Sequence, residues 1–367
     1  MLVPVVLSQE AIGAGAMRVA PTIVSVIHIR PRAKLSSMSI DFLAVGDTVV
    51  DDFIRLKDAA VNCDVDTNAC TITMRWGDKI PFESSTILAG VGNSANAAVS
   101  ASRLGLSSAL LATIGNDHDG ELILESFARE GLNTSLITRA DDKFTNHHYV
   151  LWYESERTIL VKPEPYEYVF PKDLEPPKTI YLSSLGNASV TYYEDMARYL
   201  HEHPDIFLTF QPGTFQMKMG SEALKPIYAR TNLLVVNKEE AARILNLEST
   251  ESITVLLEKL MALGPKTVII TDGRLDAHAF DGEKTLLIPM YPDNRPPFER
   301  TGAGDAFAST ITAALSLGKP LEEALLWGPI NSMSVVQEVG AQKGLLTREV
   351  LEDYLVKAPP EYRVSNL

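Results

Sequence analysis

Short apolar segments alternate with amphipathic helical segments through the second half of this chain of 367 residues. The apolar segments are 179–182, 206–210, 233–236 and 267–270. Strands that are apolar throughout are buried on both faces, and intervening helices connect them as parallel neighbours. The pattern therefore predicts an α/β fold, a mostly parallel central sheet with helices on both faces.

The first half of the chain adds two kinds of segment. Residues 42–46 and 109–114 are short apolar strands ending near glycine, and residues 120–130 have helical spacing. Stretches such as 71–76 and 147–162 instead alternate polar and apolar residues. Because alternation indicates half-exposed strands, we expect a small separate sheet from about 53–89 and 145–163. Such a sheet can act as a lid over an active site.

The ends of the chain differ from the rest. Residues 1–37 hold four arginines and lysines against Glu10 alone, and Met38 precedes the first clear strand. We expect these residues to be a disordered extension or a start-site artefact, with a targeting presequence as the alternative. The main domain is predicted over 38–360, followed by a C-terminal tail at 361–367.

Charge and composition exclude several classes of function. The net charge of −14 disfavours a nucleic-acid or anionic-membrane partner, because nothing offsets phosphate repulsion. No apolar run is long enough to span a bilayer. Two cysteines, Cys63 and Cys70, indicate neither a metal site nor a disulfide framework. They favour a reducing compartment, and we expect a cytoplasmic protein.

One glycine-rich stretch carries the clearest chemical signal. In residues 301–307 two glycines and an alanine precede Asp305, and an apolar run with helical spacing follows. Unpaired N–H groups at a helix N-terminus bind anions, and glycines let an anion approach them closely. An acid beside a bound phosphate can accept a proton from an attacking hydroxyl. An ordinary acidic cap after a glycine turn is the alternative.

Polar clusters follow several other predicted strands, at the edge where open α/β sheets bind ligands. Glu240 could hold a water-ligated Mg²⁺, or it could simply complement the helix dipole. The clusters are Asp47, Asp51 and Asp52 after the first strand, Asn93 and Asn96 after Gly92, Asn237 with Glu240, and Thr271 with Gly273.

The order of these motifs resembles the ribokinase-like (PfkB-type) family of carbohydrate and nucleoside kinases, over roughly residues 40–357. The resemblance implies a ribokinase-like three-layer sandwich with a mostly parallel central sheet and a small β-sheet lid. It also implies ATP-dependent transfer of the γ-phosphoryl group to a hydroxyl of a sugar, sugar acid or nucleoside. A homodimer formed through the lid is also expected, because a small two-sided sheet cannot bury both apolar faces within one subunit, and the resemblance supports it. A monomer whose lid folds onto its own active site is the alternative.

The resemblance assigns roles at matching positions, and K⁺ joins ATP and Mg²⁺ as an implied cofactor. The roles are Asp305 as catalytic base; Gly302, Ala303 and Gly304 as anion hole; Asp51, Gly92, Asn93 and Asn96 for the substrate; Asn237, Thr271, Gly273 and Asn331 for the nucleotide; Glu240 for Mg²⁺; and Glu299, Thr301 and Gly340 for a monovalent cation.

Departures from the family pattern leave the acceptor open. Val91 stands where a glycine is usual, Asp276 replaces a common glycine, and the segment between Asp51 and Gly92 is long. A catalytically silent member that binds ligands or acts as a scaffold is therefore an alternative. A dinucleotide-binding oxidoreductase is disfavoured, because no glycine fingerprint follows the first strand. Four aromatic residues of the lid are expected to pack within it, with contact to the substrate as the alternative: His147, His148, Tyr149 and Trp152.

Overall fold

The structure is a computed structural model that describes residues 39–63, 70–154, 156–186, 188–248, 250–292 and 295–367. Residues 39–367 form one compact unit. The expected extension at 1–37 lies outside the described residues. No helix in the described part of the chain is both long and apolar enough to cross a membrane.

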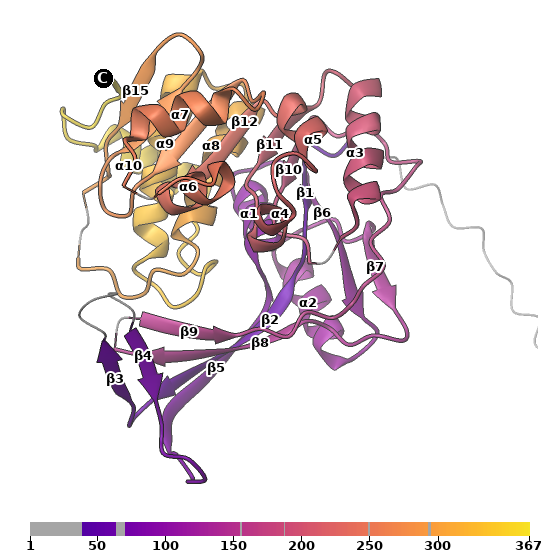
Figure 1. The fold of residues 1–367 in the computed structure, drawn as a ribbon, viewed down its shortest axis with the longest axis vertical. Helices are drawn as coiled ribbons and strands as arrows, with labels where there is room; N and C mark the ends of the chain where they lie inside the picture. Colours follow the sequence, from indigo (N-terminus) through magenta and orange to yellow (C-terminus); the bar gives the residue numbers. More distant parts are fainter. Residues whose placement is uncertain (1–38, 64–69, 155, 187, 249, 293–294) are drawn as a thin grey trace, which may run out of the picture. The chain divides into compact units, whose positions relative to one another are not determined.

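Within the described residues, ten strands form the main sheet in the order β16-β15-β14-β13-β12-β11-β10-β1-β6-β7. Neighbours from β7 to β13 are parallel, whereas β14, β15 and β16 are antiparallel. The predicted mostly parallel sheet is therefore confirmed (Figure 1). The strands are β1 (Phe42–Val45), β6 (Ser108–Gly115), β7 (Ile137–Ala140), β10 (Thr179–Leu182), β11 (Phe207–Phe210), β12 (Leu233–Asn237), β13 (Thr267–Thr271), β14 (Ala277–Phe280), β15 (Thr285–Ile288) and β16 (Ser365–Asn366).

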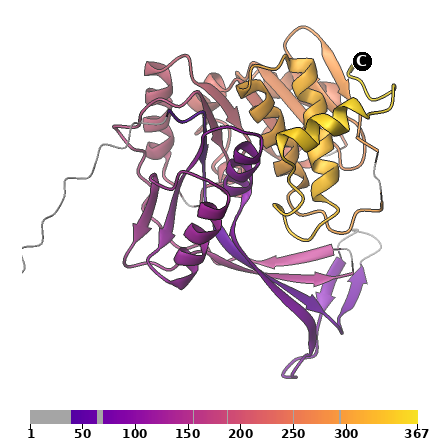
Figure 2. The same ribbon diagram turned by 180° about the vertical axis from the view of Figure 1, so that it is seen from behind.

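Helices cover both faces of this sheet, as Figures 1 and 2 show. Alternate residues of β1 enter different cores, since Phe42 and Ala44 pack on one side and Leu43 and Val45 on the other. The first core is covered by α1 (Asn93–Arg103), α2 (His118–Arg129), α8 (Ala303–Ser316), α9 (Leu321–Val335) and α10 (Arg348–Val356). The second is covered by α3 (Val190–Glu202), α4 (Thr214–Met219), α5 (Lys225–Arg230), α6 (Lys238–Leu245) and α7 (Ile253–Met261).

A smaller sheet forms the lid, in the order β5-β2-β8-β9. It consists of β2 (Val49–Leu56), β5 (Phe82–Val91), β8 (His147–Tyr153) and β9 (Glu156–Leu160). Strands β8 and β9 form the predicted hairpin, while β2 pairs with β8 in parallel and with β5 in antiparallel orientation. A separate hairpin of β3 (Ala60–Cys63) and β4 (Cys70–Thr73) follows β2 along the chain.

Two details differ from what the sequence predicted. Cys63 and Cys70 form a disulfide at paired positions of β3 and β4, so the expectation that they form no disulfide is wrong. The argument for a reducing compartment from cysteine usage loses its basis with it. The C-terminal segment 361–367 is no detached tail, because β16 pairs with β15 and the buried Tyr362 hydroxyl donates to the Leu326 carbonyl.

Candidate active site

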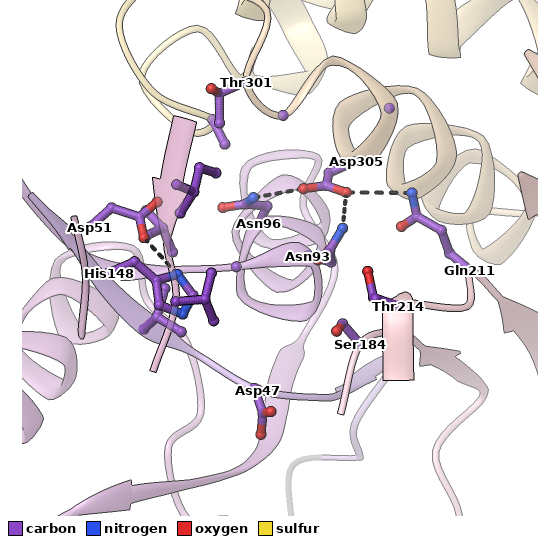
Figure 3. A pocket seen from close by; sticks show the side chains of 18 of the residues that line it. Asp47, Asp51, Asn93, Asn96, His148, Ser184, Gln211, Thr214, Thr301 and Asp305 are labelled. Atoms are coloured by element: carbon purple, nitrogen blue, oxygen red, sulfur yellow. Dashed lines mark hydrogen bonds and ion pairs between the residues drawn. The ribbon is translucent and has the colours of Figure 1, made fainter. Parts of the chain in front are cut away.

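A cavity of about 750 Å³ lies at the carboxyl ends of the central parallel strands. Its wall combines lid residues from β2, β8 and β9 with residues that follow β11 and β12 and with the first residues of α1 and α8. Figure 3 shows some of these side chains. Open α/β sheets bind their ligands at this edge, so the cavity is the candidate active site.

Helix α8 begins at the cavity with its N-terminal N–H groups exposed to it. Gly302, the residue before the helix, has a left-handed φ of 79°. A Cβ atom there would lie 2.3 Å from the Ala341 Cβ, so only glycine fits. The backbone N–H of Ala306 donates to the Gly302 carbonyl (2.8 Å), which leaves the N–H groups of Gly304 and Asp305 ahead of the helical ladder. This geometry suits an anion.

Asp305 is buried, with 8% of its surface exposed. The Asn93 amide donates to Oδ1 (2.7 Å) and the Asn96 amide to Oδ2 (2.8 Å), while Gln211 lies 3.4 Å from Oδ1. Burial raises the pKa of Asp305, and these hydrogen bonds oppose the rise. Figure 3 shows these hydrogen bonds to the Asp305 carboxylate. The carboxylate therefore has a fixed position and a pKa above that of an exposed aspartate.

The two asparagines reach Asp305 because of how α1 begins. Gly92 precedes the helix with φ 112°, and a Cβ there would lie 3.0 Å from the Asp47 carbonyl. Residues three apart in a helix share a face, which brings Asn93 and Asn96 to the same carboxylate. Both were predicted to bind substrate; the structure places both on the cavity wall and bonds both to Asp305.

Asp51 and His148 line another part of the cavity. Strand register pairs them across β2 and β8. The His148 Nδ1 lies 3.3 Å from Asp51 Oδ1 but without hydrogen-bond geometry, so that buried oxygen has no hydrogen-bond partner among the described residues. A carboxylate oxygen of this kind can accept a hydrogen bond from a ligand hydroxyl.

His147 and Trp152 pack, as the sequence suggested, whereas Tyr149 is largely exposed. His147 contacts Asp119 (2.8 Å), and Tyr149 lies on the outer face with 47% exposure. Trp152 stacks edge-on against Phe298, with ring centroids 5.5 Å apart. His148 lines the cavity, because alternation places it on the opposite face of β8 from His147 and Tyr149.

Asp47 also lines the cavity, but its oxygens are already in use. Tyr168 donates its hydroxyl to Oδ1 (2.8 Å), and the Gly186 N–H donates to Oδ2 (2.6 Å). Burial raises the pKa of Asp47 to about 6, against the lowering effect of these bonds. Figure 3 shows the Asp47 side chain directed away from Asp305, consistent with a clamp between the turn after β1 and the loop after β10.

Asn237 and Glu240 cap α6 reciprocally on the predicted nucleotide side. The Glu240 N–H donates to Asn237 Oδ1 (2.8 Å), and the Asn237 N–H donates to Glu240 Oε2 (2.9 Å). Both residues line the cavity, and burial raises the pKa of Glu240. No cluster of three or more metal-binding side chains occurs among the described residues. Mg²⁺ often binds through one carboxylate, waters and substrate phosphates, so Glu240 fits such a site.

The remaining residues that were predicted to bind the nucleotide differ in their position relative to the cavity. Thr271 lines the cavity, whereas Gly273, with φ 60°, is not part of its wall. Asn331 is fully buried in α9, away from the cavity wall. Its amide donates to Thr310 (2.7 Å) and accepts from the Leu346 N–H (2.9 Å). Both ends of the Asn331 amide are occupied by these hydrogen bonds, which connect α9 to α8 and to the segment at Leu346. We therefore do not assign Asn331 to the nucleotide.

Glu299, Thr301 and Gly340 do converge, but around hydrogen-bond donors. The Glu299 carboxylate, 3% exposed, accepts from the Thr301 N–H (2.7 Å), the Thr301 hydroxyl and the Gly340 N–H (3.3 Å). Arg157 Nη1 lies 3.4 Å from the same carboxylate. A monovalent cation needs oxygen ligands, and here donors and a guanidinium face the carboxylate. The described residues therefore do not fit the expected K⁺ site.

Several side chains of the cavity wall were missed by sequence reasoning, among them Gln211, Arg157 and Lys218. Gln211 directly follows β11, as Asn237 closes β12, so its position at a strand end was an available signal. Arg157 lies in the lid hairpin, and only the folded hairpin brings it to the cavity.

Comparison with known proteins agrees with this geometry. Residues 85–348 match the family described as pfkB family carbohydrate kinase. The chain is thus a phosphotransferase that uses an alcohol group as acceptor. It belongs to the pfkB family of carbohydrate kinases, which confirms the resemblance seen in the sequence.

Relatives in this family differ in their acceptors. A ribokinase of Bacillus subtilis is 27% identical over 272 residues, covering 72% of this chain and 87% of its own. A nucleoside kinase of Methanocaldococcus jannaschii is 25% identical over 269 residues, covering 72% and 85%. The solved structure of Arabidopsis thaliana ribokinase complexed with ribose and ATP superposes with a TM-score of 0.72 at 19% identity, covering 87% and 99%. The structural match shows that the fold is shared.

Proposed function

We propose that this protein transfers the γ-phosphoryl group of ATP to a hydroxyl of a sugar, sugar acid or nucleoside. The observation that carries the proposal is the Asp305 carboxylate, buried beside the N-terminus of α8 and facing the cavity. It combines a proton acceptor with backbone donors for a phosphoryl group in one place.

Asp305 acts as the general base. The acceptor hydroxyl gives its proton to the carboxylate as its oxygen attacks phosphorus. Asn93 and Asn96 orient the carboxylate, and its raised pKa strengthens it as a proton acceptor. Gln211 extends this support, since it also accepts a hydrogen bond from the Tyr181 hydroxyl.

The first turn of α8 stabilises the developing negative charge. The backbone of Gly302, Ala303 and Gly304 lines the cavity next to the base, where the positive end of the helix dipole lies. Glu240 and Asn237 face the phosphates, and Mg²⁺ held near Glu240 would neutralise phosphate charge. Thr271 contacts the nucleotide farther along the same edge.

The lid holds the acceptor. Asp51 accepts hydrogen bonds from its hydroxyls through the unpartnered Oδ1, with His148 beside it. Phe53 and Val161 contribute apolar surface to the same wall. A closed lid excludes water, which would otherwise compete as acceptor.

A screen of sugars, sugar acids and nucleosides, with ADP release as the readout, tests the function. With the best acceptor, Asp305→Asn is expected to lower kcat about 10²–10⁴-fold while nucleotide binding persists. Near-normal kcat in this variant would show that Asp305 is not the base. No acceptor-dependent ADP release from the wild type would instead favour the alternative, a silent family member that binds ligands.

We also propose that two copies pair through the outer face of the lid. This face carries Tyr149 and Leu160, cross-strand neighbours that are 47% and 52% exposed. Ile87 on β5 is 56% exposed. Apolar side chains on an exposed sheet favour burial against a second sheet.

A further inference from the structure

Arg157 joins the lid to the segment that precedes the anion hole. It lies on β9, opposite Trp152 of β8, and its guanidinium approaches the buried Glu299 carboxylate (3.4 Å). Trp152 packs on Phe298, the residue before Glu299. Two successive residues of that segment thus contact the lid hairpin.

Glu299 organises the backbone on either side of the anion hole. Its carboxylate accepts hydrogen bonds from Thr301, which directly precedes Gly302, and from the Gly340 N–H. Gly340 precedes Ala341, whose Cβ bounds the space at Gly302. A buried carboxylate without a compensating charge is costly, so this arrangement requires a cation.

We propose that Arg157 is that cation, and that it replaces a bound monovalent metal ion as a positioning residue of the kinase reaction. The inference rests on the proposed function. Closing the lid brings the guanidinium to Glu299, which orders Thr301 and the first turn of α8 for phosphoryl transfer. The turnover of this protein is therefore independent of K⁺ and dependent on Arg157.

Two further observations favour Arg157 over a metal ion. Two of the three groups directed at Glu299 are backbone N–H donors, which complement a carboxylate and cannot ligate a cation, and the Thr301 hydroxyl donates its proton to the same carboxylate. Arg157 Nε is buried without a hydrogen-bond partner among the described residues, and the guanidinium is thus held by its charge contact rather than by a polar network. Its charge also lowers the pKa of Asp305 against the larger effect of burial.

The test compares the wild type with Arg157→Met and Arg157→Lys in about 200 mM KCl and in tetramethylammonium chloride at the same concentration. The two solutions have the same ionic strength, so they screen surface charge equally. The wild type is expected to have the same kcat and Tm in both salts. Arg157→Met is expected to lose about 10²-fold in kcat with little change in KM for ATP, because the anion hole is misplaced. Arg157→Lys keeps the charge and should lose less.

Three results would overturn the proposal: stimulation of wild-type kcat by K⁺, a rise of wild-type Tm in K⁺ by more than about 2 °C from ion binding, or equal losses in the two Arg157 variants. Arg55→Ala is the matched control, since Arg55 is a lid arginine that pairs with Glu83 (3.1 Å) and not with Glu299. Its kcat should stay close to that of the wild type.

The Tm comparison needs no turnover, so it separates this inference from the proposed function. If the wild type phosphorylates no acceptor, the kinase proposal fails while K⁺ binding is still decided by Tm. Asp305→Asn provides the same readout in a protein without base catalysis. It should also show no K⁺-dependent stabilisation.

Discussion

The main sheet and the lid sheet differ in how far their strands are buried. All four residues of β1 are fully buried, since helices cover both faces of the main sheet. In β5 of the lid, the residues from Phe82 to Ile87 are exposed, and only its end near α1 is buried. The main sheet is stable through burial, whereas the lid depends on one covered face and on contacts such as Trp152 with Phe298.

This difference divides the work of the active site. The proposed base and anion hole lie on α8, which is packed into the main core. Asp51 and His148, the groups proposed to bind the acceptor, lie on lid strands. We therefore expect substitutions in the main sheet to act on folding and substitutions in the lid to act on acceptor binding.

The largest expected effect on stability comes from a comparison of two leucines, one in each sheet. Leu43 in β1 is fully buried and Leu160 in β9 is 52% exposed. Leu43→Ala should lower the free energy of unfolding by about 2–5 kcal/mol, because it leaves a cavity in the core. Leu160→Ala should change it by less than about 1 kcal/mol. Urea denaturation of both variants checks this, and similar losses would contradict the division.

Two adjacent aspartates of β2 allow a comparison of the inner and outer faces of the lid. Asp51 faces the cavity, whereas Asp52 accepts a hydrogen bond from Ser85 (2.8 Å) in the neighbouring strand. Asp51→Ala should raise KM for the acceptor about 10²-fold, through lost charge-assisted hydrogen bonds, and leave ATP affinity unchanged. Asp52→Ala is the control and should leave both constants close to those of the wild type. Weakened ATP binding in Asp51→Ala would contradict its placement.

Asp47 connects the two regions and makes stability depend on pH. Its pKa is raised to about 6 by burial, so the folded protein binds a proton more tightly than the unfolded chain. That stabilisation is present below about pH 4 and is lost as pH rises through about 6. Asp47→Asn keeps its size and removes the charge. The free energy of unfolding of this variant, relative to the wild type, should therefore rise by about 2 kcal/mol from about pH 4.5 to about pH 7.5. A constant difference across this range would mean that Asp47 titrates normally.

The smallest expected effect on stability concerns the outer face of the lid. Tyr149→Glu should shift a dimer to monomers in sedimentation at micromolar concentration, because a charge would be buried in the interface. The free energy of unfolding of the monomer should stay within about 0.5 kcal/mol, since the side chain is exposed. Trp152 is unsuitable for this test, because it packs against Phe298 inside the molecule. A wild type that sediments as a fully active monomer would rule the dimer out.

The amino-acid sequence alone predicted the fold class and the candidate chemical centre. Runs of apolar residues between helical segments require a parallel sheet, because only burial on both faces suits them. The stretch around Asp305 defines a helix start with an acid at the anion site, because glycines and a following apolar run have local consequences. Asp51, Asn96 and Glu240 were predicted for similar reasons, since each follows a strand or opens a helix, and each lines the cavity.

The tertiary structure decided which side chains meet across long separations. Asn93 and Asn96 reach Asp305 from more than 200 residues away along the chain, and no local pattern predicts that contact. The direction of His148 depends on strand register, because a shift of one residue reverses the face of every side chain. The burial of Asn331 outside the cavity wall and the contact of Arg157 with Glu299 have the same origin. Each depends on how separately formed elements pack, which periodicity and composition do not encode.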